Sequence, residues 1–486
     1  MSRHVLIALA VAVLVGTAAL ASLVGRPSAG GARTPGSTLA GTLVDRDGDG
    51  SLERGAGEQL RDRTELAPRS PTGRTLATFA QVSDVHLADE ESPARAVFLD
   101  RLGAPFESTF RPQEALGGQV LAQTVAALNR LRPQAVVLTG DLIDNAQSNE
   151  LDEALAILRG GRVDPDSGAP GYSGPQSRSN VDPFYYRPDV DAPRHPGLLR
   201  RAERPFSSSG LRAPWYPVLG NHDALVQGEV APTAATDAVA VGSRMLLGIE
   251  RPGDIPTSQR ELSPGLVQRT LERGLPGRVL PVPADAARRQ LRVPELLTRL
   301  RLTSGHGGSG PRLDYSFDIG RHVRVVVLDA VRRGGGSDGH LPASVLPWLH
   351  AQLAAAGRRW VIVFSHQPLD RSAGGSAVLG LLDQDSRMVA AIAGHSHRNA
   401  IVPRSTPAGG YWLITTASLI DYPQQARAFR LVATRRGGVA LETWMIDHGN
   451  RHDAGVSREL AFLDAQGGRP RHDAGRRLDR NVRLYR

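Results

Sequence analysis

The chain has 486 residues, of which 41% are hydrophobic but only 5% aromatic, so a core must be built mainly from Ala, Val and Leu. It contains no cysteine, which excludes disulfides and thiolate metal sites. The formal net charge is +9, and because lysine is absent, all 58 basic residues are arginines. These arginines are dispersed, so a codon bias explains the charge better than a basic surface for nucleic acid or anionic lipid.

The N-terminal segment is apolar. Val5–Val24 is rich in Ala, Val and Leu and carries no charge. Its length suffices to span a bilayer, and residues 19–21 (Ala-Leu-Ala) fit a small-residue cleavage site. We therefore expect residues 1–25 to be a signal peptide or a membrane anchor. In both cases the rest of the chain is exported and is extracellular, periplasmic or held at the membrane outside the cytoplasm.

Residues 26–74 are predicted to be a linker that ends in an acidic turn. The first part is rich in Gly, Ala, Pro, Ser and Thr. Asp45, Asp47 and Asp49, followed by glycine, match the start of a calcium loop, but its twelfth position is Ala56, where a bidentate glutamate is needed. A solvated acidic turn is the preferred interpretation, and calcium binding stays open.

From about residue 75, short apolar runs end in polar clusters. Their length and their Val and Ile content are typical of buried strands, and helical patterns lie between some of them. This alternation predicts an α/β fold with ligands at the carboxyl ends of the strands. The expected strands are Leu76–Val82, Ala135–Leu138, Tyr216–Leu219, Val323–Leu328, Trp360–Phe364 and Val389–Ala393, with a final pair at Tyr411–Thr416 and Ala428–Val432. The expected helices include Gly118–Leu131 and Ser344–Ala355.

The predicted domain, residues 75–450, is interrupted by two long insertions. Residues 160–213 are rich in Pro, Gly, Ser and Arg, whereas residues 224–312 contain helical stretches such as Ala286–Leu302. Residues 451–486 are polar and rich in arginine and are predicted to be a poorly ordered tail.

Five polar clusters follow five of the apolar runs. They are Asp84-Val85-His86, Gly140-Asp141, Gly220-Asn221-His222-Asp223, Ser365-His366 and Gly394-His395-Ser396-His397. The two D-x-H and H-x-H pairs place side chains two positions apart, which point the same way in an extended chain and can reach one cation. Each cluster alone is a weak signal, but together they predict a metal site.

The order of these clusters resembles the calcineurin-like metallophosphoesterase superfamily, whose pattern runs D-x-H, G-D, G-N-H-D/E, H and G-H-x-H. The chain also looks like an exported bacterial subgroup with long insertions between the motifs. The resemblance covers about residues 76–450 and implies a four-layer α/β/β/α sandwich with the site on loops at one edge. It further implies two metal ions with these ligands: for the first Asp84, His86 and His397, for the second Asn221, His366 and His395, and between them Asp141.

The resemblance also implies catalytic residues. His222 would lie near the metals without binding them, and Asp223 would orient it. Our own hypothesis is that His222 donates a proton to the leaving oxygen or stabilises the charge there. Asn145 and Arg398 are weaker candidates for contact with substrate.

These residue types suit hydrolysis of phosphate esters. Imidazole and carboxylate ligands bind Mn, Fe or Zn. Two cations about 3.5–4 Å apart neutralise the ester and activate a shared water, which attacks phosphorus as a hydroxide. We therefore expect an exported metal-dependent phosphatase or phosphodiesterase. The alternative is an inactive cell-envelope binding protein on the same fold. Such a protein would be expected to have lost at least one metal-ligating His or Asp. The natural substrate and the oligomeric state stay open.

Overall fold

The computed structural model describes residues 34–486, apart from residues 104–105, 107, 252–275 and 469–473. The predicted signal peptide or anchor, residues 1–25, therefore lies outside the described residues. Among the described residues, no helix has both the length and the apolar character needed to cross a membrane.

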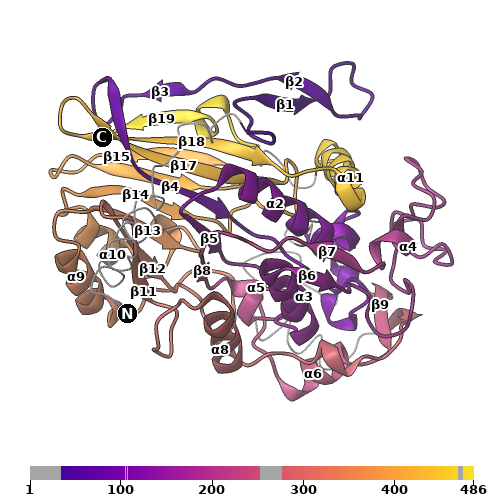
Figure 1. Cartoon of the computed structure of the whole chain (residues 1–486). Coiled ribbons are helices and arrows are strands. Elements are labelled where there is room, and N and C mark those ends of the chain that lie inside the picture. The colour runs from indigo at the N-terminus through magenta and orange to yellow at the C-terminus, as the bar shows by residue number, and fades with distance from the viewer. Residues whose placement is uncertain (1–33, 104–105, 107, 252–275, 469–473) are drawn as a thin grey trace, which may run out of the picture.

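Two large β-sheets form the centre of the molecule, which confirms the predicted α/β class (Figure 1). The seven-stranded sheet has the order β3 (Arg61–Arg63), β19 (Val482–Tyr485), β18 (Val439–Asp447), β17 (Gln425–Thr434), β4 (Thr72–Val82), β5 (Ala135–Thr139) and β8 (Trp215–Val218). The six-stranded sheet has the order β11 (Tyr315–Ile319), β12 (Val323–Leu328), β13 (Trp360–Ser365), β14 (Met388–Ala393), β16 (Tyr411–Thr415) and β15 (Ala400–Arg404).

Smaller elements surround the sheets. The short hairpins are β1 (Gly41–Val44) with β2 (Glu53–Ala56), β6 (Gly161–Val163) with β7 (Phe206–Ser208), and β9 (Arg244–Ile249) with β10 (Gly277–Pro281). The α-helices are α2 (Gly117–Leu131), α3 (Ser148–Arg159), α4 (Leu198–Ala202), α5 (Asn221–Ala224), α6 (Ala234–Ala240), α8 (Val293–Ser304), α9 (Val345–Ala355), α10 (Gly375–Leu382) and α11 (Ala454–Gln466). The 3₁₀ turns are η2 (Pro93–Arg95), η3 (Val97–Leu102), η4 (Glu114–Leu116), η6 (Ala286–Arg288), η7 (Leu369–Arg371), η8 (Arg451–Asp453) and η9 (Arg477–Asp479).

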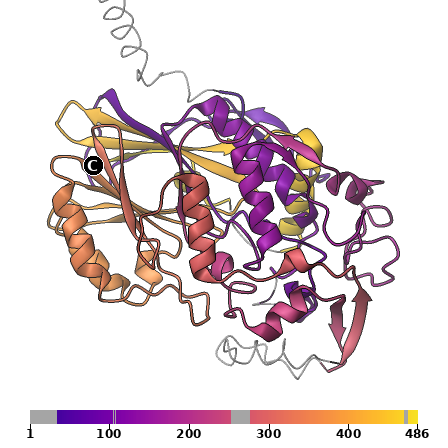
Figure 2. The ribbon, with the colours of Figure 1, turned by 60° about the horizontal axis from the view of Figure 1, so that its bottom comes forward.

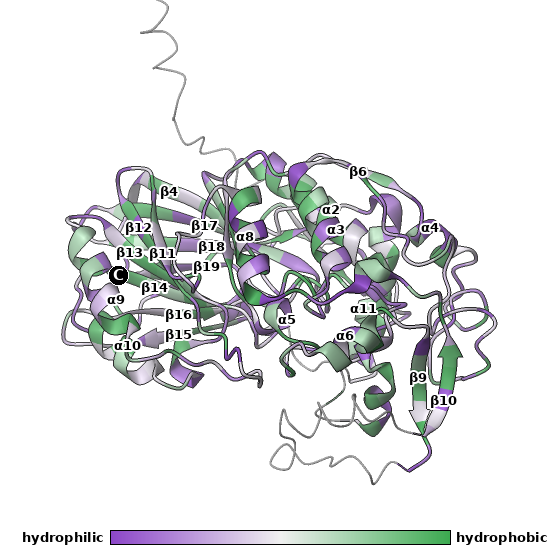
Figure 3. Ribbon diagram, turned by 90° about the horizontal axis from the view of Figure 1, so that it is seen from below, coloured by the Kyte–Doolittle hydropathy of each residue, from purple (hydrophilic) through white to green (hydrophobic). Residues whose placement is uncertain are grey.

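The predicted strands are buried runs of apolar residues. Strands β4, β5 and β8 are parallel to one another, and so are β12, β13, β14 and β16. Parallel strands are covered on both faces, so their sequences are apolar without alternation. Figure 3 shows hydrophobic colour along these strands, while helices α2, α3 and α8 carry both colours.

Aromatic rings pack where the two sheets face each other. Phe79 of β4 stacks on Phe429 of β17 with 4.7 Å between ring centroids, and its edge meets Phe364 of β13 at 6.2 Å. Gln81, two residues after Phe79, donates to the carbonyl of Ala393 at 3.1 Å and so also links the sheets. These contacts hold β4, β13 and β14 in fixed relation, and their carboxyl ends carry three of the predicted clusters.

Helices cover the faces of the sheets that are turned away from this contact. Leu349 of α9 and Leu379 of α10 pack in one buried cluster with Val326 of β12 and Val363 of β13. The alternate residues of β12, such as Val325, join the main core instead. The main core also takes in the apolar residues of α2 and α3.

One predicted strand pairing is wrong. Tyr411–Thr415 and Gln425–Thr434 are both strands, but β16 pairs with β14 and β15, whereas β17 pairs with β18 and β4. The two strands therefore belong to different sheets. The turn between them crosses from one sheet to the other, which apolar patterning cannot reveal.

The prediction of a poorly ordered tail at 451–486 is also wrong for its described residues. Helix α11 occupies Ala454–Gln466, and β19 pairs with both β18 and β3. Val482 and Leu484 of β19 are fully buried. Burial of these alternating apolar side chains outweighs the polar, arginine-rich composition around them.

The predicted linker likewise contains structure. The β1–β2 hairpin encloses the acidic turn of Asp45, Asp47 and Asp49, and β3 joins the edge of the seven-stranded sheet. The turn carboxylates accept backbone N–H groups of their own loop, for example Asp45 from Gly48 at 2.7 Å.

The insertions contribute to the core as well as to the periphery. Leu296 and Leu300 of α8 are buried in the main core, next to β8. The expected helical stretch Ala286–Leu302 is split into η6 and α8, because α8 begins with a proline in its first turn. The β9–β10 hairpin, by contrast, projects from the body of the molecule (Figures 2 and 3).

Candidate metal centre

The loops after β4, β5, β8, β13 and β14 meet at one edge of the paired sheets. The backbone N–H of Asp84 donates to the carbonyl of Gly140 at 3.1 Å, which joins the first two loops. The N–H of Gly394 donates to the carbonyl of His366 at 3.0 Å, which joins the last two. The N–H of His222 donates to Asp141 at 2.8 Å, and His366 Nε2 lies 3.0 Å from the amide oxygen of Asn221, so all five predicted clusters are brought together.

Two glycines permit this close approach. A Cβ at Gly140, whose φ is +87°, would lie 2.5 Å from His366 Nδ1, and a Cβ at Gly220 would lie 2.1 Å from the backbone nitrogen of Asp141. Either contact is far below van der Waals distance. The glycines that precede Asp141 and Asn221 in the sequence are therefore required by packing.

The D-x-H and H-x-H pairs do not reach a common point through the alternation of side chains along a strand, as the sequence analysis expected. Strand β4 ends at Val82, so the D-x-H pair lies beyond it in a loop. Left-handed backbone conformations are rare for non-glycine residues and concentrate at functional sites. Five predicted ligands adopt them, namely Asp84 (φ 51°), His86 (φ 45°), Asp141 (φ 49°), His395 (φ 63°) and His397 (φ 51°).

The first donor set is built around two facing histidines. His86 Nδ1 donates to Asp144 at 2.9 Å, and His397 Nδ1 donates to Asp421 at 2.6 Å. In the neutral rings both Nε2 atoms therefore carry lone pairs, and these atoms lie only 3.0 Å apart. An oxygen of Asp84 lies 3.5 Å from His397 Nε2. Three acceptors thus point at one place.

The second donor set has the same character. His366 Nδ1 donates to the carbonyl of Thr139 at 2.8 Å, which leaves its Nε2 lone pair facing the amide oxygen of Asn221 at 3.0 Å. The same oxygen lies 3.1 Å from His395 Nδ1. Acceptors gathered in a buried place repel one another unless a proton or a cation lies between them, so both sets fit metal ions.

Asp141 lies between the two sets. Its Oδ2 atom is 3.1 Å from His366 Nε2 and 3.6 Å from His86 Nε2. Burial opposes its charge, but the nearby His366 and His222 hold the pKa of Asp141 well below its usual range. A carboxylate that stays ionised within reach of both sets is suited to bridge two cations.

The histidines of the two sets differ in their pKa values, and so in how readily they bind a proton. Burial lowers the pKa of His86 to about 4 and that of His395 to about 3. Burial also opposes the charge of His366, yet Asp141 raises the pKa of His366 to about 9. Burial opposes the charge of His397 as well, but its hydrogen bond to Asp421 raises the pKa of His397. Each set therefore contains one histidine that favours a proton when no metal is bound, and metal binding must displace it.

Comparison with known proteins agrees with this geometry. The profile of the family described as calcineurin-like phosphoesterase matches residues 77–399, which contain every predicted ligand. The chain belongs to the calcineurin-like phosphoesterase family. As a member it is a metal-dependent phosphoric ester hydrolase, and its grouped His and Asp side chains supply sites for two divalent ions, as predicted.

Solved structures with a similar chain path include other phosphatases. A dimetal phosphatase from Danio rerio is 16% identical, with a TM-score of 0.39, and the match covers 77% of this chain and 97% of that one. A purple acid phosphatase from yellow lupin seeds is 11% identical (TM-score 0.33; 77% and 53% covered). PhoD is 11% identical (TM-score 0.33; 83% and 80% covered). A comparison with curated proteins gives no match.

His222 lies beside both donor sets of the phosphoesterase without entering either. Its Nδ1 is 2.9 Å from the carbonyl oxygen and 3.2 Å from a carboxylate oxygen of Asp144, and its ring centroid is 4.4 Å from that of His86. Burial disfavours its charge, but Asp141 and Asp144 raise the pKa of His222 to about 9. The side chain is 20% exposed, so a ligand can reach it.

Asp223 does not orient His222, which corrects the prediction from the sequence. Its carboxylate is 3% exposed and accepts backbone N–H groups from four residues of two loops, namely Gly220, Asp141, Leu142 and Ile143. It fastens the start of α5 to the loop of the bridging aspartate. Adjacent residues at the start of a helix point in different directions, so Asp223 cannot also face the ring of His222.

The two weaker candidates lie in different surroundings. Asn145 is fully buried, its amide oxygen accepts from the side chain of Gln227 at 2.8 Å, and its amide nitrogen lies 3.4 Å from Asp144. These contacts hold Asn145 inside the protein, and its contact with substrate stays a prediction. Arg398, next to the ligand His397, is exposed, which leaves its contact with substrate a prediction.

Two buried carboxylates of the phosphoesterase were missed by the sequence analysis. Asp144 follows Asp141 by three positions in one loop, so a search for second carboxylates near the ligands would have found it. Asp421 lies 24 positions after His397 and does not directly follow a predicted strand, so no local signal marks it. Both orient histidines, which is a frequent role of carboxylates behind metal ligands.

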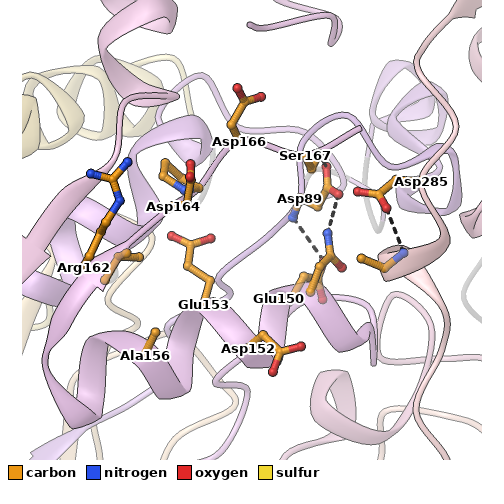
Figure 4. Close-up of a pocket in the computed structure, with 14 residues that line it drawn as sticks. Asp89, Glu150, Asp152, Glu153, Ala156, Arg162, Asp164, Asp166, Ser167 and Asp285 are labelled. Carbon is orange, nitrogen blue, oxygen red and sulfur yellow. Dashed lines mark hydrogen bonds between the residues drawn. The ribbon is translucent and has the colours of Figure 1, made fainter. Parts of the chain in front are cut away.

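A polar cavity of about 320 Å³ lies between α3 and residues 162–167 (Figure 4). Carboxylates dominate its lining, including Asp89, Glu150, Glu153 and Asp166. None of these residues is a predicted ligand of the metal centre. Because burial disfavours the charged form of a carboxyl group, this grouping affects the pH dependence of stability.

Proposed function

We propose that this phosphoesterase is exported, holds two metal ions at one centre and hydrolyses phosphate mono- or diesters. The observation that carries the proposal is the position of Asp141, one oxygen of which lies within 3.6 Å of an imidazole nitrogen in each donor set. A shared carboxylate is what a dinuclear centre needs. Every predicted ligand contributes to one of the two sets, which speaks against an inactive binding protein.

When bound, two such cations neutralise the charge of a phosphate ester and activate water as the nucleophile. Asp84, His86 and His397 would hold the first ion, and Asn221, His366 and His395 the second. The chain holds its own histidines in the tautomers that this requires, because each first-set ring donates from Nδ1 to a carboxylate.

We assign the proton that the leaving oxygen needs to His222. Asp144 fixes its Nδ1, so the Nε2 atom is left to face an ester. The raised pKa supplies a protonated ring, and neighbouring cations would bring that pKa down toward neutral pH by repulsion. A donor with a pKa near the operating pH is most effective in general acid catalysis.

The second insertion is proposed to shape the entrance to this centre. Its first residues form a tight loop against the ligands: the carbonyl of Gly228 accepts from the Asn221 amide at 3.2 Å, and a Cβ at Gly228 would lie 2.4 Å from His222 Nε2. Residues 224–312 therefore contribute a wall beside the proton donor. Loops in such positions commonly determine which substrates bind.

The apolar segment Val5–Val24 supports export, either by cleavage or as an anchor. Placement outside the cytoplasm is also compatible with a centre that uses no thiolate ligand, since oxidation cannot destroy it.

One experiment tests both parts. The chain without residues 1–25 is loaded with Mn, Fe or Zn, its metal content is measured, and nitrophenyl mono- and diesters are offered. We expect two metal ions per chain and hydrolysis that a chelator abolishes. The full chain is expressed in parallel, and the same activity should be found outside the cytoplasm. Two bound metals without hydrolysis of any ester would identify a binding protein, and activity confined to the cytoplasm would refute export.

A further inference from the structure

Gln227 donates to Asp144 at 3.0 Å and Ser418 to Asp421 at 2.8 Å, and each of these two carboxylates behind the first metal site also has an arginine beside it. Asp421, which accepts from His397, also accepts from Arg111 Nε at 2.6 Å. Asp144, which accepts from His86, lies 3.7 Å from Arg95 Nε. Both arginines belong to the segment between the first two sequence clusters, in and after η2.

Glu114 joins the two arginines. Its carboxylate accepts from both terminal nitrogens of Arg95, at 2.5 and 2.6 Å, and from the backbone N–H of Arg111 at 3.0 Å. Arg95, Arg111 and Glu114, named here the arginine clamp, thus connect Asp144 to Asp421. The charges alternate in sign along the whole path, from the carboxylate behind one histidine to that behind the other.

The arginine clamp is buried throughout. Arg95 is 1% exposed, Glu114 3% and Arg111 4%, and the two carboxylates that it holds are no more exposed. A substrate cannot reach these groups, so contact with the ester is not their function. Buried ion pairs add little net stability, but they fix geometry, because removal of one partner leaves the other as a buried, unpaired charge.

The second metal site has no such support. His366 Nδ1 donates to the carbonyl of Thr139, a backbone group that β5 holds in place. The described contacts of its ring include no carboxylate behind Nδ1 and no arginine. The two sites therefore depend on different parts of the chain: the second on the sheet, the first on the segment from η2 to η4.

We propose that the arginine clamp is a positioning device for the first metal site, which holds His86 and His397 in register and so sets the affinity of that site independently of the second. The proposal rests on the metal centre of the proposed function. It assigns a role to residues 95–114, which lie outside every sequence cluster. Removing outer partners of metal-bound histidines typically weakens metal affinity about 10–100-fold.

The test measures the affinity of each site by itself. His366→Ala leaves the first site as the stronger one, and His397→Ala leaves the second. Into each background we place Arg111→Gln or Glu114→Gln and titrate Co²⁺ against a chelator, following the visible absorption of bound cobalt. First-site affinity should fall about 10–100-fold, and second-site affinity should change by less than about threefold. Arg288→Gln is the matched control, because Arg288 is equally buried and pairs with Asp89 instead.

A double substitution shows whether Arg111 acts through Asp421. If it does, Arg111→Gln adds no further loss of first-site affinity in an Asp421→Asn chain. Equal losses at both sites, full additivity with Asp421→Asn, or the same loss from Arg288→Gln would each overturn the proposal. A wild-type chain that binds both ions but hydrolyses no ester would refute only the proposed function, since these affinities are read without turnover.

Discussion

At the scale of single residues, Asp144 serves two histidines with different roles. One of its oxygens is 2.9 Å from His86 Nδ1 and 3.2 Å from His222 Nδ1. The first ring is a metal ligand and the second is the proposed proton donor. Because one carboxylate fixes both rings, the proton donor is positioned relative to the metal centre and not only to the substrate.

Replacing His222 separates these roles. In His222→Ala we expect both metal ions to stay bound, because no ring atom of His222 belongs to either donor set. Turnover of esters with poor leaving groups should fall about 100-fold or more, and that of nitrophenyl esters much less, since good leaving groups need no proton. Metal analysis and kcat for both ester types check this. His350→Ala, on the exposed side of α9, is the control. Unchanged kcat with the poor leaving groups would disprove the assignment.

The metal ligands were predictable because each directly follows a buried strand. Asp84 and His395 stand at such ends, where an apolar run gives way to polar residues. The residues that orient them were not predictable in this way, since Asp421 meets His397 only through the folding of a distant turn. Asp223 was assigned to His222 from adjacency, but the free backbone N–H groups at the start of α5 are what its carboxylate satisfies.

At the scale of elements, composition gave the wrong prediction for short strands that form only because a neighbouring strand offers an unpaired edge. β19 is a four-residue strand in an arginine-rich stretch, and β3 has three residues, all of them charged. Neither has a pattern that stands out. Each becomes a strand because β18 offers β19 an unpaired edge, and β19 then offers one to β3. The long buried strands, by contrast, were predictable from their own residues.

Because β19 pairs with the sheet, a substitution in β19 tests whether the tail belongs to the folded domain. Leu484 is fully buried in β19, whereas Leu478, six residues earlier, is 44% exposed. Leu484→Ala should lower the free energy of unfolding by about 2–5 kcal/mol, and Leu478→Ala by less than about 0.5 kcal/mol. Urea denaturation followed by circular dichroism measures both. Equal, small effects would mean that the tail is not part of the folded domain.

At the scale of the whole molecule, net charge and buried charge predict opposite responses to pH. The formal charge of +9 suggests that stability rises toward the alkaline isoelectric point as repulsion declines. The carboxylates around the cavity of Figure 4 oppose this. Burial raises the pKa of Glu150, which lines this cavity, to about 8. Burial and the adjacent Asp89 raise the pKa of Glu90, which is not part of the lining, to about 7. Burial also raises the pKa of Glu153 well above its usual range.

The direction in which stability changes with pH follows from proton binding. A carboxyl group whose pKa is higher in the folded than in the unfolded state holds its proton longer when folded, so stability is lost as pH rises through the folded pKa. Metal-loaded protein is used, because its metal-bound histidines stay neutral across this range and do not titrate. The free energy of unfolding should fall between pH 6.5 and 8.5. Glu153→Gln, neutral at every pH, should be more stable than wild type at pH 8.5, by a margin that shrinks as the pH is lowered. The exposed Asp370→Asn should show no such trend. A free energy of unfolding that rises across this range in wild type would mean that the net charge dominates and that these carboxyl groups ionise freely in the folded chain.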